Sequence, residues 1–294
     1  ETGIIFLGDF WHVRGALSVD LLNRVLKSLQ KWTVPVVMIP GNHDQVSLGG
    51  QVHALEPLVY AFNGREEQIL LISEPSVCMG ALWLPYRRNN ELLREALAVS
   101  APKFVCGDVS IVFCHADVKG AMMNDDIVSR GGADLGIFPN GIPIYSGHFH
   151  KPHTLVSKGR RLTYVGSPYQ TSLSEAHQKK FLYVLSMTNE SRSIDANSSI
   201  ATSSSAGNIR NNKKKDITFR WCEQAVGVQS NSSGEETLPI LLGRRYHRAS
   251  GVHDPLLFDD NQVVPGDRVV LPIDSGDMRK EDSRRTLDML RKRG

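Results

Sequence analysis

The chain has 294 residues, 41% hydrophobic and 22% charged, with a formal net charge of +3 at pH 7. This length allows a sizeable core, and the composition is typical of a soluble globular protein. The small positive excess permits a nucleic-acid partner without indicating one, and no apolar run approaches the roughly 20 residues of a membrane span. The chain is therefore expected to have no membrane partner.

The first half of the chain predicts alternating strands and helices. The apolar run at 4–7 predicts a buried strand, and apolar residues at helical spacing from Leu21 to Trp32 predict a helix after it. Later runs predict strands at 36–40, 69–72 and 81–84. Helices are predicted at 51–62 and at 89–100, the second capped by Asn89 or Asn90.

Strands dominate the middle of the chain, at 109–115, 142–148, 153–158, 161–167 and 180–187. Residues 188–215 are rich in Ser and Asn and have almost no large apolar side chains, so burial cannot offset their ordering entropy. The predicted organisation is a core at 1–187, a disordered insertion at 188–215, and a region at 216–294. That last region contains further strands and a basic helix from Met278, and could be the start of a cap.

The cysteines are four in number and far apart in the sequence. Cys78, Cys106, Cys114 and Cys222 form no C-x-x-C pair, which argues against a disulfide framework and against a cysteine zinc site. An intracellular, reducing compartment is the simpler interpretation, and the organelle stays open.

Four short polar motifs each follow an apolar strand. They are Gly8-Asp9-Phe10-Trp11-His12, Gly41-Asn42-His43-Asp44, Cys114-His115-Ala116 and Gly147-His148-Phe149-His150. Singly they are weak signals, because an Asp at a strand end is more often a turn or cap residue and a lone His more often packs in the interior. Together they supply carboxylate, amide and imidazole ligands without thiols, a set that suits Mn, Fe or Zn.

Such a ligand set also suggests a reaction. Asp9 can bridge two ions through its two oxygens, and two ions roughly 3.5–4 Å apart can activate water and stabilise displacement at a phosphate ester. Glycines at 8, 41 and 147 are expected to let the backbone turn sharply beneath the ligands.

These motifs resemble a known family. "GDFWH", "GNHD", "CHA" and "GHFH", in this order, resemble the second to fifth signature blocks of the calcineurin-like metallophosphoesterases. The later "YVGSPYQTSLSE" at 164–175 is similar to the G-S-P segment of the SbcD branch of DNA-repair nucleases. The resemblance covers residues 3–187. It implies an α/β metallophosphoesterase-type sandwich of two sheets flanked by helices, with a small C-terminal accessory region.

The resemblance also implies a role for each motif residue. Asp9 would bridge two divalent ions, expected to be Mn²⁺, with Fe, Zn and Mg as alternatives. Asn42, His115 and His148 would hold the second ion and His150 the first. His43 would be the catalytic histidine, as its imidazole chemistry allows. Asp44 would orient His43, and His12 would help to place the DNA strand near the reacting group.

Two aromatic residues are candidates for substrate contact. Trp11 and Tyr169 could stack on a nucleobase, although packing in the core or at its rim is the commoner role of such side chains. His153 lies close enough to the site in sequence to touch substrate. The resemblance further implies DNA as the substrate and an SbcC-like ATPase as a partner, and it leaves a homodimer open.

The family's first block, a D-x-H at the end of a preceding strand, has no counterpart before Asp9. The expectation is that the strand at 4–7 is the second of its sheet and that the first strand lies outside this chain. The first ion would then keep only Asp9 and His150, so that this chain would bind one ion well, a second poorly, and be nearly inactive.

The function predicted from the sequence is metal-dependent hydrolysis of phosphodiester bonds by a DNA exonuclease or endonuclease of the SbcD type. One alternative is a phosphatase or nucleotide phosphodiesterase of the same fold. Another, from a different class, is a non-catalytic isoform that acts as a binding or scaffold protein, which the missing first block makes plausible.

Overall fold

The structure is a computed structural model, and it describes residues 3–12, 16–47, 49–62, 69–124, 127–175, 178–180, 182–192, 216–223, 246–248 and 268–270. Within these ranges no helix is long and apolar enough to cross a membrane.

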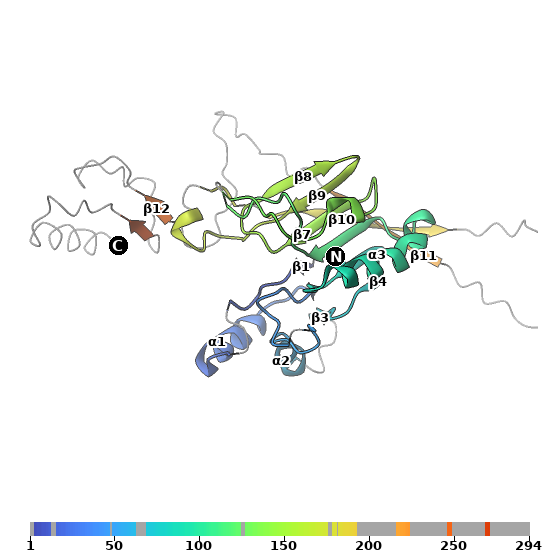
Figure 1. Ribbon diagram of the computed structural model, residues 1–294. Coiled ribbons are helices and arrows are strands. Elements are labelled where there is room, and N and C mark those ends of the chain that lie inside the picture. The colour runs from blue at the N-terminus through green and yellow to red at the C-terminus, as the bar shows by residue number, and fades with distance from the viewer. Residues whose placement is uncertain are drawn as a thin grey trace, which may run out of the picture.

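The smaller sheet is parallel and has the order β1-β2-β3, with β1 at Ile4–Phe6, β2 at Val36–Met38 and β3 at Ile69–Leu71. Helices α1 (Val19–Leu29) and α2 (Glu56–Ala61) lie beside it (Figure 1). Leu29 of α1 and Leu58 of α2 share one apolar cluster with Met38 of β2. The two helices therefore cover the outer face of this sheet.

The larger sheet has the order β4-β5-β6-β7-β9-β8. Its strands are β4 (Ser76–Cys78), β5 (Ala81–Leu84), β6 (Ile111–His115), β7 (Pro143–Gly147), β8 (His153–Ser157) and β9 (Arg160–Tyr164). The four strands β5, β6, β7 and β9 are parallel, and the two edge strands are antiparallel to their neighbours. Helix α3 (Asn90–Val105) covers the outer face of this sheet.

Alternating side chains of the larger sheet join it to the layers on either side. In β6, Ile111 and Phe113 belong to the cluster that also contains Leu7 and Ile39 from the smaller sheet's side. Val112 and Cys114, which point the other way because a strand has a side-chain period of 2, belong to the α3 cluster. The layers run helix, sheet, sheet, helix, which confirms the predicted α/β sandwich.

Some predicted elements have different bounds. The helix predicted at 51–62 begins only at Glu56, because His53 pairs with Gln45 in an isolated bridge. Asn89 is the cap of α3, as its side chain accepts a hydrogen bond from the amide of Glu91 at 2.9 Å. That helix continues to Val105, and β4 had not been predicted at all.

The predicted insertion starts later than expected. Strands β10 (Leu185–Arg192) and β11 (Asp216–Glu223) form an antiparallel pair with Arg192 opposite Asp216. The boundary placed at residue 188 therefore lies inside a strand, because backbone pairing orders these polar residues without burial. Residues 193–215 and the basic helix predicted from Met278 lie outside the described residues.

Strand β11 is attached to the larger sheet through one tryptophan. The Trp221 amide donates to Ser110 Oγ at 3.1 Å, its indole N–H donates to the Met79 carbonyl at 2.7 Å, and its ring packs edge-on against Phe113. By these contacts Trp221 belongs to the core, although the sequence placed it in the accessory region. The remaining elements are the short helices η1 (Leu135–Ile137) and η2 (Leu173–Glu175) and the paired strands β12 (Tyr246–Arg248) and β13 (Arg268–Val270).

Candidate metal centre

The candidate site lies where the carboxyl ends of the parallel strands of both sheets meet. Asp9 follows β1, Asn42 follows β2, His115 ends β6 and His148 follows β7. The two sheets are joined at this point by His115, whose Nδ1 lies 2.6 Å from the carbonyl oxygen of Leu7. This is the usual place for a site in an α/β sheet, because every parallel strand delivers its next residue to the same edge.

Three side chains converge there with ligand atoms of the kinds that bind divalent metals. One carboxylate oxygen of Asp9 and one ring nitrogen each of His115 and His148 lie within 4.8 Å of one another. The Asn42 amide oxygen lies among them, 3.0 Å from His115 Nε2 and 2.8 Å from His148 Nδ1. The sequence prediction that these four residues come together is borne out in their placement.

The hydrogen bonds of this group are consistent with metal binding. His115 Nδ1 donates to the Leu7 carbonyl, so its Nε2 is the nitrogen that faces Asp9, at 3.4 Å from the carboxylate. A metal-binding histidine commonly has its other ring nitrogen fixed in this way by a carbonyl or carboxylate. The donor set therefore fits a divalent ion held by Asp9, Asn42, His115 and His148.

The protonation states of the group are set by burial and by one close pair. Burial would raise the pKa of Asp9, but the nearby His115 outweighs it and lowers the pKa to about 2. Burial lowers the pKa of His115, and Asp9 outweighs that to raise it. For His148 both burial and the neighbouring His115 lower the pKa, to about 3. Asp9 is thus ionised and His148 neutral near pH 7, and a metal bound at His115 Nε2 would displace a proton there.

Close packing and strained backbone accompany the ligands. Asp9 has φ of 58° and His148 of 95°, a left-handed conformation that is uncommon for residues with a Cβ and costs about 1–3 kcal/mol each. Of the three glycines expected to give sharp turns, Gly8 does so with φ of 89°. Gly41 is required for space instead, because a Cβ there would lie 2.6 Å from the His115 ring.

His43 lies next to the group without belonging to it. Its backbone N–H donates to the Asp9 carboxylate at 2.8 Å, and its Nδ1 lies 2.9 Å from the carbonyl oxygen of His12. The exposed His12 ring is stacked on the His43 ring, with centroids 5.5 Å apart and 12° between the planes. The two predicted non-ligand histidines are therefore paired beside the metal ligands.

Asp44 does not orient His43, contrary to the sequence prediction. Its buried carboxylate accepts hydrogen bonds from the backbone amides of Asp9 at 2.7 Å, Gly41 at 2.9 Å and Trp11 at 2.9 Å. The ring of His43 is held instead by the His12 carbonyl. Asp44 therefore joins the loops after β1 and β2, so that Asp9 and Asn42 are held in a fixed relation.

Trp11 is a core residue and does not stack on a substrate base, because its side chain is buried and its indole N–H donates to the Ala54 carbonyl at 2.9 Å. His153 is also structural. Its Nε2 accepts from the Met122 amide at 2.9 Å and its Nδ1 donates to the Lys151 carbonyl at 2.8 Å. Neither nitrogen is available to a metal. Tyr169 is partly exposed, and its substrate contact stays a prediction.

His150 does not join the converging group. Its Nδ1 lies 2.8 Å from the buried carboxylate of Glu175, in η2, and 3.1 Å from Thr171 Oγ1. Its predicted role as a ligand of the first ion stays a prediction. The structure adds Glu175 as a neighbour that the sequence reasoning had not singled out.

Tyr86 is a second residue that sequence reasoning missed. It follows β5, and its ring lies nearly parallel to His148 at 6.0 Å and edge-on to His115 at 5.9 Å. A signal was present, since Tyr86 comes directly after an apolar parallel strand as the ligands do.

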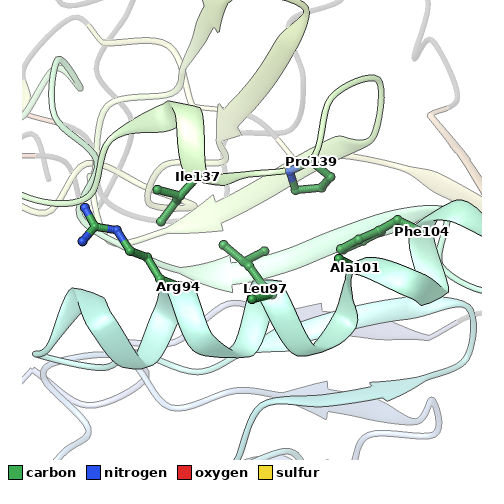
Figure 2. A pocket seen from close by; sticks show the side chains of 7 residues that line it. Arg94, Leu97, Ala101, Phe104, Ile137 and Pro139 are labelled. Atoms are coloured by element: carbon green, nitrogen blue, oxygen red, sulfur yellow. The ribbon is translucent and has the colours of Figure 1, made fainter.

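A separate small pocket lies between α3 and the 137–139 segment (Figure 2). It has a volume of about 270 Å³ and a mostly apolar lining of Leu97, Ala98, Ala101, Phe104, Ile137 and Pro139, with Arg94 at its edge. Such a lining offers no ligands to a metal, so this pocket is not part of the candidate site.

Comparison with known families places this site in context. The family model of the calcineurin-like phosphoesterases matches residues 3–152, slightly more than half of the chain. The chain belongs to the calcineurin-like phosphoesterase family. All four converging residues lie inside the matched range, whereas Glu175 lies beyond it. Among curated proteins no match to the chain was found. A metal-dependent phosphoesterase is thus the activity class that the family supports.

Proposed function

We propose that this protein is a two-metal phosphodiesterase, most simply a Mn²⁺-dependent DNA nuclease of the SbcD type. The observation that carries the proposal is the direct link between His43 and the candidate metal ligands. The backbone N–H of His43 donates to the Asp9 carboxylate at 2.8 Å, which sets a candidate proton donor beside the group that would bind metal.

Divalent ions bound at such a site activate water and neutralise charge that develops on a phosphate group. The protein side chains prepare for this in the way already described. Asp9 supplies a carboxylate that stays ionised, His148 a neutral imidazole, and Asn42 an amide oxygen directed at both histidines. Each of these would contribute a lone pair to an ion.

His43 is suited to transfer a proton at one defined atom. Its Nδ1 donates to the carbonyl of His12 at 2.9 Å, and a donor is required there whether the ring is neutral or cationic. Proton exchange is thereby confined to Nε2. A cationic His43 can give that proton to the leaving oxygen, as a general acid does.

DNA is proposed as the substrate on two grounds. The segment at 164–175 is similar to the corresponding part of the SbcD nucleases, and Ser167, Thr171 and Glu175 of this segment all contact one another or His150. His12 is exposed beside His43, where a strand longer than one nucleotide would pass. An SbcC-like ATPase partner, a homodimer and an intracellular location belong to the same proposal and rest on the resemblance and the cysteine spacing.

The experiment compares hydrolysis of linear duplex DNA, a small chromogenic phosphodiester and a phosphomonoester in saturating Mn²⁺, so that a weakly bound ion is also present. We expect Mn²⁺-dependent hydrolysis of both diesters. A preference for the monoester would favour a phosphatase, and bound metal without any hydrolysis would favour a binding protein.

His43→Ala is the decisive variant. We expect the rate to fall by about 10²–10⁴, the usual contribution of general acid catalysis, with Mn²⁺ affinity unchanged by calorimetry. His12→Ala serves as the graded comparison and should reduce release from duplex ends more than hydrolysis of the small diester, because only the long substrate needs orientation. Wild-type rates in His43→Ala would contradict the assignment, and loss of Mn²⁺ would make His43 a ligand.

A further inference from the structure

Glu175 is buried directly behind His150. One oxygen of its carboxylate, Oε1, lies 2.8 Å from His150 Nδ1 and also accepts from the hydroxyl of Thr171. The other, Oε2, lies 2.7 Å from Lys180 Nζ and 3.1 Å from the Thr171 amide. The side chain of Glu175 is 6% exposed, whereas that of His150 is 47% exposed. The carboxylate is therefore enclosed, and the histidine ring faces outward from it.

Lys180 closes this arrangement into a ring of contacts. Its side chain is 1% exposed, and Nζ donates both to Glu175 Oε2 and to the backbone carbonyl of His150, the latter at 2.8 Å. One ammonium thus holds the main chain of His150 and also the carboxylate that binds its side chain. A buried ion pair is by itself weak support for stability, because the desolvation of both charges offsets their attraction. A role in specifying geometry would explain this placement.

We propose that Glu175, held by Lys180, is a positioning residue that keeps His150 protonated at Nδ1 and so reserves its Nε2 for a metal ion. A carboxylate accepts and cannot donate, so the ring nitrogen that faces it must carry the proton. Histidines that bind metals are commonly oriented by such a carboxylate, and its loss costs about 10–100-fold in metal affinity. The candidate site then extends beyond the family match, to residue 180.

Glu175→Gln should reverse the tautomer. At the Oε2 position Lys180, the Thr171 amide and Ser167 Oγ, at 3.3 Å, all approach as donors. The glutamine oxygen is therefore expected there, which places the amide NH₂ against His150 Nδ1. That nitrogen must then accept, so the proton moves to Nε2 and the lone pair for a metal is lost.

The test is ¹⁵N NMR of histidine-labelled, metal-free protein, in which protonated and unprotonated ring nitrogens are resolved. We expect His150 to be the Nδ1–H tautomer in the wild type and the Nε2–H tautomer in Glu175→Gln. Lys180→Met is the matched control, because it removes the buried cation but leaves the carboxylate, and it should keep the Nδ1–H tautomer. The double variant removes the unpaired ammonium should Glu175→Gln fail to fold, and it should again show Nε2–H.

Calorimetry with Mn²⁺ supplies the second readout. Glu175→Gln should weaken the ion that contacts His150 by about 10–100-fold and leave the ion at Asp9, Asn42, His115 and His148 within about twofold. An unchanged tautomer, or an equal loss of both ions, would overturn the proposal and leave Glu175 a structural residue. The inference rests on the proposed two-metal function, but the tautomer is measured without metal or substrate, so the two can fail separately.

Discussion

Two buried carboxylates support this site, and they do so in opposite ways. Asp44 is 0% exposed and Glu175 is 4% exposed. Burial raises the pKa of Asp44, and the amides of Trp11 and Gly41 do not compensate. Burial acts in the same direction on Glu175, but hydrogen bonds from His150 and Lys180 outweigh it and lower the pKa.

The difference teaches what each kind of partner is suited to hold. Backbone amides are numerous and rigid, so Asp44 fixes the path of two loops and thereby the position of Asp9. A cation and an imidazole are single side chains, so Glu175 fixes one ring. Equal burial therefore predicts neither the sign of a pKa shift nor the function of the group, because both depend on whether the partner carries a full charge.

The largest expected effect is that of removing Asp44. Asp44→Ala leaves three backbone amides of the site without their acceptor, and each buried unsatisfied donor costs about 1–3 kcal/mol. We expect the free energy of unfolding in urea to fall by about 3 kcal/mol or more, and Mn²⁺ binding to be lost. Asp134→Ala, which removes an exposed carboxylate bound to one amide, Gly136, is the control and should cost about 1 kcal/mol or less. Similar costs for both variants would break the comparison.

The next effect is a pH dependence of opposite sign. The pKa of Glu175 is lowered in the folded protein, so its stabilisation is complete above the unfolded value of 4.5 and is lost as the pH falls below it. The pKa of Asp44 is raised above 3.8, so the wild type gains relative stability as the pH falls.

Urea unfolding between pH 7 and pH 3 should show this contrast. The cost of Glu175→Gln should shrink toward acid pH and that of Asp44→Asn should grow, each by up to about 1.4 kcal/mol per pH unit. Parallel pH profiles for the two variants would mean that the charged partners of Glu175 do not distinguish it from Asp44.

The smallest effect sharpens the description of Glu175. Thr171→Val removes the hydroxyl that donates to this carboxylate but keeps the backbone amide that also donates to it, at 3.1 Å. We expect a loss of about 0.5–1.5 kcal/mol, the usual net value of one hydrogen bond, with the His150 tautomer unchanged in NMR. A reversed tautomer would show that Thr171, and not Glu175, sets the state of the ring.

Local sequence patterns predicted the two sheets and the convergence of Asp9, Asn42, His115 and His148. That was possible because apolar strands are visible in the sequence and parallel strands deliver their ends to one edge. The same logic would have found Tyr86 after β5.

What the patterns could not predict depends on contacts between residues far apart in the chain. Asp44 acts on the amides of Asp9 and Trp11, which precede it by 35 and 33 positions, and nothing local distinguishes that role from orientation of the adjacent His43. Trp11 follows the end of β1, where no strand periodicity assigns a face, so its burial was not readable. Glu175 and Lys180 are separated by two turns of polar sequence that resemble a surface loop.

The long reach of these contacts also bears on how the chain is made. The first ligand of the site is Asp9, and the lysine that closes the contacts around His150 is residue 180. At a synthesis rate of about 5–20 residues per second, roughly ten to thirty seconds separate their appearance. During that interval the nascent smaller sheet has no second sheet to cover its inner face, which includes Ile39. On the ribosome this face is an exposed apolar surface, and it is the part of the newborn chain that a chaperone would have the most reason to shield.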